Sequence, residues 1–327
     1  MLNQSLSSLP SFARAYIHHL GVINKSENTQ LAYAQELVLF FQYLCDTFDE
    51  FPSSPASLEI SDLERIQHTD IEAYLSWART YRKNGVRALA RKQAAIRSLY
   101  HYLLKEDLIL KDVTLKLDAI QVNQKLPKAL EPEQIADLTD ILESGIGMSK
   151  GQLKYHNYTE KRDFAIFLTF IGTGLRLSEL CSLKLQNIDF NKGCFYVIRK
   201  GNKETQIYFN HEVSDALMDY IKSERLRYAI NEPDALFLSM QGNEISKRAV
   251  QNLIKKYLNV LQSFGYNTEG FSAHKLRSTF ATLLLRETNN LAIVQDALGH
   301  SDPRTTRIYA KVLDEQLRRA ANLIKFK

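Results

Sequence analysis

The sequence predicts a mainly helical protein of two domains, with one small antiparallel sheet in the second domain. The chain of 327 residues has about the length of two average domains. Apolar residues recur every three or four positions through the first hundred residues, as on one face of a helix. Three short strand-like runs with turn sequences between them follow later in the chain. We therefore expect a helical domain over residues 1–122 and a mixed helical and sheet domain over residues 123–327.

Three helices are expected in the first domain, over residues 26–45, 69–82 and 86–106. Ser26 is the expected N-cap of the first of them, because its hydroxyl can accept a hydrogen bond from a free backbone N–H. The third helix carries a basic outer side as well as an apolar stripe. That outer side is made of Arg87, Arg91 and Ser98, with Lys92 and Arg97 on its flanks.

In the second domain, a helix is expected to begin at Pro132, since proline favours the first helical position. The glycine-containing stretch 145–160 is typical of a surface loop, and the apolar stretch 163–173 of a further helix. A short helix should follow Gly174, and helices should return after residue 211. The expected strands cover residues 187–190, 194–199 and 205–209.

Composition and charge limit the classes of function. Hydrophobic residues make up 45% of the chain and charged residues 24%, which is ordinary globular usage. The net charge of +5 permits a nucleic-acid partner without requiring one. No apolar run is long enough to span a bilayer, and the N-terminus lacks a secretion signal. We therefore expect a soluble cytoplasmic protein with no membrane partner.

Several familiar cofactor sites have no counterpart in the sequence. There is no phosphate-binding G-x-x-x-x-G-K-[ST] motif, no H-E-x-x-H motif and no cysteine–histidine spacing for zinc. Carboxylates are not clustered as a two-metal phosphodiesterase requires. The three cysteines form no C-x-x-C pair and are expected to be small buried side chains in a reducing compartment. We therefore expect neither a cofactor nor a metal.

Two local patterns contain candidate cationic residues. The stretch 172–180 places Arg176 just after two glycines and at the start of a helix, where a guanidinium can bind two phosphate oxygens. Lys200 stands on the turn after an expected strand, from which an ammonium can deliver a proton to a leaving alkoxide. Taken separately, each has an ordinary alternative, namely a surface ion pair for Arg176 and a polar hairpin tip for Lys200.

Two further patterns lie near the C-terminus. His274 and Arg277 are three residues apart, so they share one face of a helix. Gly299 is typical of a helix end and leaves His300 on an exposed corner. Tyr309 follows nine residues later, at the start of a further expected helix. Each of these residues taken separately is also common in surfaces and cores without any catalytic role.

The order and local context of these six residues resemble the tyrosine recombinase family, the group of lambda integrase, Cre and Xer proteins. The resemblance covers nearly the whole chain, and residues 126–130 are similar to the linker between the family's two domains. It implies a helical core-binding (SAM-like) domain followed by a catalytic domain, which together form a C-shaped DNA clamp. It also implies a site-specific recombinase that needs neither metal nor ATP.

The same resemblance implies a role for each residue. Tyr309 is the nucleophile that forms a 3′-phosphotyrosyl link, and Lys200 protonates the departing 5′ oxygen. His274 is the better candidate for handling the tyrosine proton, because an imidazole titrates near neutral pH. Arg176, Arg277 and His300 stabilise the negative charge of the transition state, and Glu179 orients the cationic cluster.

Two departures from the family pattern stand near these residues. Ser278 follows Arg277 where many relatives have a second histidine, so a supporting contact is expected to differ there. The stretch 145–160 is longer than in the simplest Xer proteins. Lys203 is a rival to Lys200 for the acid role, although the strand-then-turn position favours Lys200.

The implied partner is double-stranded DNA with inverted-repeat recombinase sites. In the first domain we expect contacts from Arg87, Arg91 and Ser98, and in the second from Lys247 and Arg248, which follow Ser246 at a helix start. The apolar spacing in residues 315–327 predicts a helix. In this family such a helix docks on a neighbouring subunit to form a homotetramer on DNA, and packing on its own domain is the alternative.

The resemblance leaves several functions open. Xer-like resolution of chromosome dimers is the leading hypothesis, with a second recombinase or a DNA translocase as a further partner. An integrase or excisionase of a mobile element, and a type IB topoisomerase-like enzyme, use the same nucleophile. A DNA-binding protein without activity is the remaining alternative, and the complete set of six residues argues against it.

Overall fold

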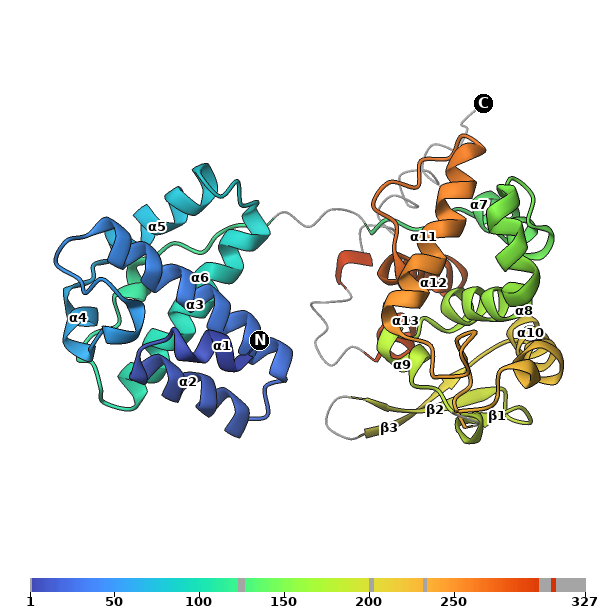
Figure 1. Ribbon diagram of the computed structural model, residues 1–327, viewed down its shortest axis with the longest axis horizontal. Coiled ribbons are helices and arrows are strands. Elements are labelled where there is room, and N and C mark those ends of the chain that lie inside the picture. Colours follow the sequence, from blue (N-terminus) through green and yellow to red (C-terminus); the bar gives the residue numbers. More distant parts are fainter. Residues whose placement is uncertain (1, 123–126, 200–202, 232–233, 300–306, 310–327) are drawn as a thin grey trace, which may run out of the picture. The chain divides into compact units, whose positions relative to one another are not determined.

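The chain folds into two compact units, residues 1–123 and 124–327 (Figure 1). The computed structural model describes residues 2–122, 127–199, 203–231, 234–299 and 307–309. Both units are mainly helical, and the second also contains a three-stranded antiparallel sheet. The mainly helical class with one small sheet, as predicted from the sequence, is therefore confirmed.

The core of the first unit lies between α3 and α6, which pack side by side (Figure 1). The hydroxyl of Ser26 accepts a hydrogen bond from the N–H of Thr29 and caps α3, as predicted. All three predicted helices are present, within two residues at most of their expected ends. The helices of this unit are α1 (Leu2–Ser7), α2 (Ser11–Val22), α3 (Glu27–Thr47), α4 (Ile60–Arg65), α5 (His68–Thr80) and α6 (Val86–Lys105), with short 3-10 turns at Pro55–Ser57 and Val113–Lys116.

The expectation that Lys92 lies on an outer flank of α6 is wrong. Its side chain is buried, and its ammonium pairs with the buried carboxylate of Glu36 on α3. Because α6 packs directly on α3, position 92 faces the neighbouring helix, where a charge is tolerated only when it is paired. Glu36 also accepts from Nε of Arg91 at 2.7 Å, so one carboxylate binds two cations.

The small sheet of the second unit lies along one side of its helices (Figure 1). Strand β2 lies between β1 and β3, and both pairs are antiparallel. The strands are β1 (Ile188–Asp189), β2 (Cys194–Arg199) and β3 (Lys203–Tyr208). The helices are α7 (Pro132–Ser144), α8 (Lys150–Thr173), α9 (Leu177–Cys181), α10 (His211–Asp219), α11 (Lys247–Ser263), α12 (Ala273–Thr288) and α13 (Leu291–Leu298); short turns of other helix types lie at Leu185–Asn187, Tyr220–Glu224, Arg225–Arg227 and Arg307–Tyr309.

The prediction of a surface loop over residues 145–160 is also wrong, because α8 begins at Lys150. Ser149 and Gln152 form a reciprocal cap, in which each side chain accepts a hydrogen bond from the other's backbone N–H. Gly151 lies in the first helical turn of α8, and a single glycine costs only about 1 kcal/mol relative to alanine, which does not break a helix of 24 residues. The first turns of α8 are polar because they are largely exposed to solvent.

Two further expectations from the sequence concern the burial of the three cysteines and the absence of membrane-spanning helices. Cys181 and Cys194 are buried, as predicted, whereas Cys45 is only half-buried; all three are free thiols. Among the residues that the structure describes, no helix is both long enough and apolar enough to cross a membrane.

Candidate active site

Arg176 and Glu179 are held together at the start of α9. Gly174 ends α8 in the left-handed conformation, with φ 61°, and a Cβ there would overlap the ring of Phe280. Arg176 follows as the N-cap of α9. Its backbone N–H and its Nη1 donate to the two carboxylate oxygens of Glu179, at 2.9 and 2.6 Å. The local chain therefore fixes this guanidinium before any ligand binds.

Glu179 is an ionised carboxylate inside this cluster. Burial raises its pKa, but the hydrogen bonds from Arg176 and the positive charges of Arg199 and Arg176 outweigh burial, so the pKa lies below its ordinary value. A permanent negative charge at this point holds neighbouring guanidinium groups in place.

Arg277 lies one turn into α12 and is 4% exposed. It donates from Nη1 to the carbonyl of Gly174 and from Nη2 to the carbonyl of Leu298, the latter at 2.6 Å. These carbonyls stand at the C-terminal ends of α8 and α13, where the helix dipoles favour a cation. Burial and the nearby charge of Arg176 lower the pKa of Arg277 to about 10, which leaves it charged at neutral pH.

His274 stands in the first turn of α12, three residues before Arg277. Partial removal from water lowers its pKa, and the positive charges of Lys275, Arg277 and Arg176 lower it further. The imidazole is therefore neutral at physiological pH and can accept a proton.

Tyr309 is buried at the end of a short 3-10 turn, with 4% of its surface exposed. Its hydroxyl is hydrogen-bonded to Ser278, and Arg277 lies close enough to act on its charge. Burial raises the pKa of the phenol, and the contacts with Ser278 and Arg277 oppose this only in part. The phenol is therefore protonated at neutral pH. Tyr309 belongs to a buried hydrophobic cluster with Ala281, Leu285, Val294 and Leu298 of α12 and α13.

The structure brings four of the predicted residues, Arg176, Glu179, Arg277 and Tyr309, into one cluster, and the charges of Arg176 and Arg277 act on His274. Nη2 of Arg176 also reaches the carbonyl oxygen of Gly299, at 3.4 Å. The predicted residues Lys200 and His300, the start of the turn at 200–203 and the tail 315–327 lie outside the described residues, and so does the side chain of Lys203.

Arg199 belongs to the same cluster, although the sequence patterns drew attention only to its neighbour Lys200. Nε of Arg199 lies 3.4 Å from Oε1 of Glu179. Phe195 and Val197 of the same strand are buried, so the two-residue repeat of a strand places Arg199 on their inner face. This alternation is the sequence signal from which its inward position could have been predicted.

The predicted DNA-contacting residues of the first unit have different environments. Arg87 is exposed at the start of α6. Arg91 is exposed as well, but its Nε is bound to Glu36. The hydroxyl of Ser98 is half-buried and accepts a hydrogen bond of 2.6 Å from the hydroxyl of Tyr16.

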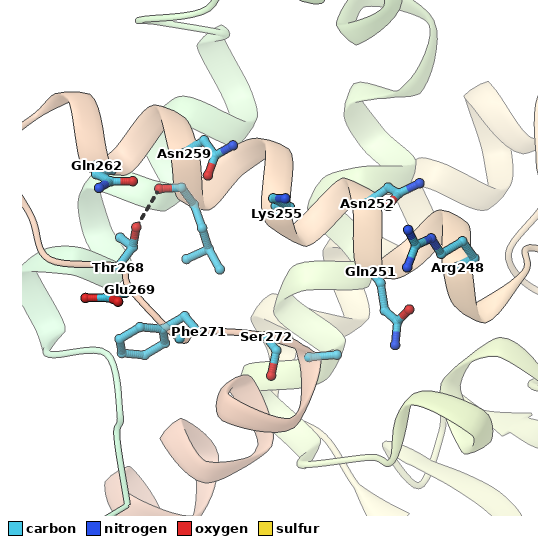
Figure 2. Close-up of a pocket in the computed structure, with 13 residues that line it drawn as sticks. Arg248, Gln251, Asn252, Lys255, Asn259, Gln262, Thr268, Glu269, Phe271 and Ser272 are labelled. Carbon is cyan, nitrogen blue, oxygen red and sulfur yellow. Dashed lines mark hydrogen bonds between the residues drawn. The ribbon is translucent and has the colours of Figure 1, made fainter. Parts of the chain in front are cut away.

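A polar groove runs along α11 in the second unit, as Figure 2 shows. It has a volume of about 430 Å³ and lies between one face of the helix and the segment that leads into α12. The predicted residue Arg248 lines it, while Ser246 caps the helix by accepting from the N–H of Ala249, and Lys247 is exposed beside it. The exposed side chains along the helix face are Arg248, Gln251, Asn252, Lys255 and Asn259.

The sequence patterns predicted only part of this groove, namely the residues at the first turn of α11. The lining residues recur at steps of three or four, which places them on one helix face. Arginine, lysine, glutamine and asparagine are the side chains that bind phosphates and the edges of bases. The far wall is fixed by the hydroxyl of Thr268, which donates to the carbonyl of Leu258 at 3.1 Å (Figure 2).

Two family models match the chain. The model of the phage integrase family matches residues 128–316, and the model of the phage integrase N-terminal SAM-like domain matches residues 13–107. Together they cover most of both units.

Curated proteins and solved structures give consistent matches. A protein named tyrosine recombinase XerC from Caldanaerobacter subterraneus subsp. tengcongensis is 36% identical, with 96% of this chain and 86% of that protein covered. One of the same name from Lactobacillus delbrueckii subsp. bulgaricus is 32% identical, with 78% and 81% covered. The fold is similar to that of the XerH site-specific recombinase bound to palindromic difH substrate, with a TM-score of 0.71, 24% identity, and 90% of this chain and 79% of that chain covered.

Proposed function

Since the chain belongs to the phage integrase family and is a Xer-like tyrosine recombinase, we propose that it exchanges DNA strands at the cationic cluster of the second unit, with Tyr309 as the nucleophile. The observation that carries the proposal is the placement of the Tyr309 phenol beside Arg277, which is itself in the electrostatic range of Arg176 and Glu179. A nucleophile and the cations that stabilise a phosphoryl transition state are thereby combined in one site.

In the cleavage step, the phenolic oxygen of Tyr309 attacks the DNA phosphorus and the bond to the 5′ oxygen breaks. The products are a 3′-phosphotyrosyl link and a free 5′-hydroxyl. Lys200 donates the proton that the leaving oxygen needs, and His274 takes the proton of the phenol. The raised pKa of Tyr309 makes such a base necessary, because the phenol carries its proton at neutral pH. Rejoining is the same exchange with a different 5′-hydroxyl, so the energy of the phosphodiester bond is conserved.

Arg176 and Arg277, together with His300, stabilise the negative charge that develops on the phosphoryl oxygens. The guanidinium groups are already ordered by Glu179 and by the carbonyls of Gly174 and Leu298. A preorganised donor of this kind is worth about 10²–10³ in rate, since it needs no reorganisation during the reaction.

DNA binding involves both units in this proposal. Arg87 and Arg91, with Ser98 on the same helix, contact the duplex from the core-binding domain, residues 1–122. Lys247, Arg248 and the α11 groove contact it from the catalytic domain, residues 123–327. The two domains close on an inverted-repeat site as a C-shaped clamp, and the segment 315–327 links four chains into a tetramer. The substrate in the cytoplasm is then a chromosome dimer.

A strand-exchange assay tests this function against the topoisomerase-like alternative. A duplex is first selected from a random-sequence pool for binding to the full chain, and two copies are placed in one supercoiled plasmid. We expect deletion or inversion of the DNA between the copies. Relaxation of a plasmid without selected sites, with no exchange between sites, would instead support a topoisomerase-like enzyme and contradict the proposal.

A further inference from the structure

Arg199, the last residue of β2, is a buried cation with unused hydrogen-bond donors. Its side chain is 7% exposed. Among the residues that the structure describes, its Nε, Nη1 and Nη2 have no hydrogen-bond partner, and its recorded ion pair is the 3.4 Å approach of Nε to Glu179. The two Nη groups carry four N–H donors in a planar fork that matches two oxygens of a phosphate.

Such an arrangement is costly in the free protein. A buried guanidinium that loses its bonds to water destabilises the fold unless other groups replace them. Burial lowers the pKa of Arg199; Glu179 opposes this change and Arg176 adds to it. Glu179 cannot fully compensate, because its Oε1 also accepts a hydrogen bond from Arg176. Among the residues that the structure describes, the positive charge of the site therefore exceeds the negative charge.

The guanidinium packs against Gly299. A Cβ at this residue would overlap Nη1 of Arg199 in its observed position. The carbonyl of the same glycine accepts from Nη2 of Arg176, and Glu179 lies against both arginines. Arg199 therefore occupies the same small space as Arg176, within the electrostatic range of Arg277.

The charge of this cluster indicates what it binds. Arg176, Arg199 and Arg277 contribute three positive charges and Glu179 one negative charge, which leaves a net charge of +2. A phosphodiester has one negative charge, and attack by an oxyanion adds a second in the pentacoordinate transition state. Among the described residues, Arg176 and Arg277 with Glu179 carry a net charge of +1, and Arg199 raises it to +2. Arg199 therefore adds positive charge that the transition state can use and the ground state does not need.

We propose that Arg199 is a third phosphate-binding arginine, whose Nη groups donate to a non-bridging oxygen of the DNA phosphate that Tyr309 attacks. This inference rests on the proposed function and adds to it a catalytic residue next to Lys200. In the free protein Glu179 holds the guanidinium, and in the complex its free donors bind the substrate.

The test compares two nicked suicide duplexes that trap the covalent adduct, one with an ordinary scissile phosphate and one with a neutral methylphosphonate. We expect Arg199→Gln to slow adduct formation about 10²–10³-fold on the phosphate. On the methylphosphonate the deficit should be at least tenfold smaller, since the charge that Arg199 neutralises is gone. Arg227→Gln, at an exposed arginine outside the site, is the matched control. Equal deficits of Arg199→Gln on both substrates would overturn the proposal.

Thermal unfolding of the full chain without DNA shows whether Arg199 binds the phosphate or stabilises the fold. Removing a buried charge whose Nη donors have no hydrogen-bond partner among the described residues should leave the unfolding temperature of Arg199→Gln unchanged or raise it, because Glu179 keeps Arg176 as its partner. Arg199→Lys keeps the charge and should restore part of the rate. A marked drop in the unfolding temperature, with no rescue by lysine, would assign Arg199 to folding instead.

A separate readout does not depend on strand cleavage. Inorganic phosphate should raise the unfolding temperature of the unmodified chain more than that of Arg199→Gln. Absence of an adduct with the unmodified chain would contradict the proposed function, and the phosphate shift would still decide on Arg199. Equal shifts in the two proteins would overturn the inference.

Discussion

Nη2 of Arg277 donates a 2.6 Å hydrogen bond to the carbonyl oxygen of Leu298, the last residue of α13, while Nη1 binds the carbonyl of Gly174. One buried guanidinium therefore joins the ends of two helices that lie more than a hundred residues apart in the sequence. The segments that follow these ends carry Arg176 and His300. The residue that we propose to stabilise the transition state thus also bridges the two helix ends.

We predict from this relationship that Arg277→Lys is not a conservative change. A lysine ammonium cannot span both carbonyls with a planar fork, so buried acceptors lose their partners. The free energy of unfolding should fall by about 1–3 kcal/mol, as measured by urea denaturation. Adduct formation on a suicide duplex should fall at least 10²-fold. Retention of both stability and rate would contradict the bridging role.

The pKa of His274 leads to a pH prediction. Because the folded-state pKa lies below the ordinary value of 6.5, the imidazole is neutral above that value and charges only at lower pH. If it accepts the proton of Tyr309, adduct formation should be constant near pH 7 and decline only below pH 6.5. His274→Gln should lower the plateau about 10²–10⁴-fold and remove the acid limb. If the rate of adduct formation by His274→Gln still declines below pH 6.5, that decline comes from the titration of another group.

The acid role of Lys200 can be tested through the leaving group. Lys200→Ala should cleave an ordinary suicide duplex about 10²–10⁴-fold more slowly. A 5′-phosphorothiolate duplex should restore the rate, since sulfur leaves without a proton. Lys203→Ala is the matched variant and should need no such rescue. If only Lys203→Ala is rescued, the acid role belongs to Lys203.

If the α11 groove binds DNA, its lysine should contribute to the salt dependence of duplex binding. Lys255 is exposed in the groove, and an ammonium there that contacts a phosphate releases a counterion on binding. Lys255→Ala should weaken duplex binding and reduce the slope of log affinity against log salt by about one between about 50 and 200 mM. Lys222→Ala, at an exposed lysine outside the groove, should change neither. An unchanged slope for Lys255→Ala would remove the groove from the DNA interface.

Local signals were sufficient to predict several elements. Ser26 caps α3 as its hydroxyl chemistry requires, and β2 spans the predicted residues, 194–199. The helix end at Gly299 was also predicted, because a left-handed helix end favours glycine. Gly174 was predicted only as the residue before the next helix, whereas it also ends α8 in the left-handed conformation. From these ends alone, the approach of Arg176, Arg277 and Tyr309 could be anticipated only through family resemblance.

The remaining features depend on packing between distant segments. Lys92 is buried because α6 packs on α3, where its ammonium pairs with Glu36. The local sequence does not predict that contact. Helix α8 begins ten residues before the predicted end of the loop, since the cap of Ser149 outweighs the glycine at 151. Arg199 points inward by strand alternation, yet its contact with Gly299 requires the tertiary fold.

The proposed function depends most directly on attack of the phenolic oxygen of Tyr309 on the DNA phosphorus. The most direct measurement is mass spectrometry of the peptide that remains linked to a nicked suicide duplex after digestion. We predict a single linkage, at Tyr309 through a 3′-phosphate, and no adduct with Tyr309→Phe. A linkage at another residue, or an adduct that persists in Tyr309→Phe, would contradict the account.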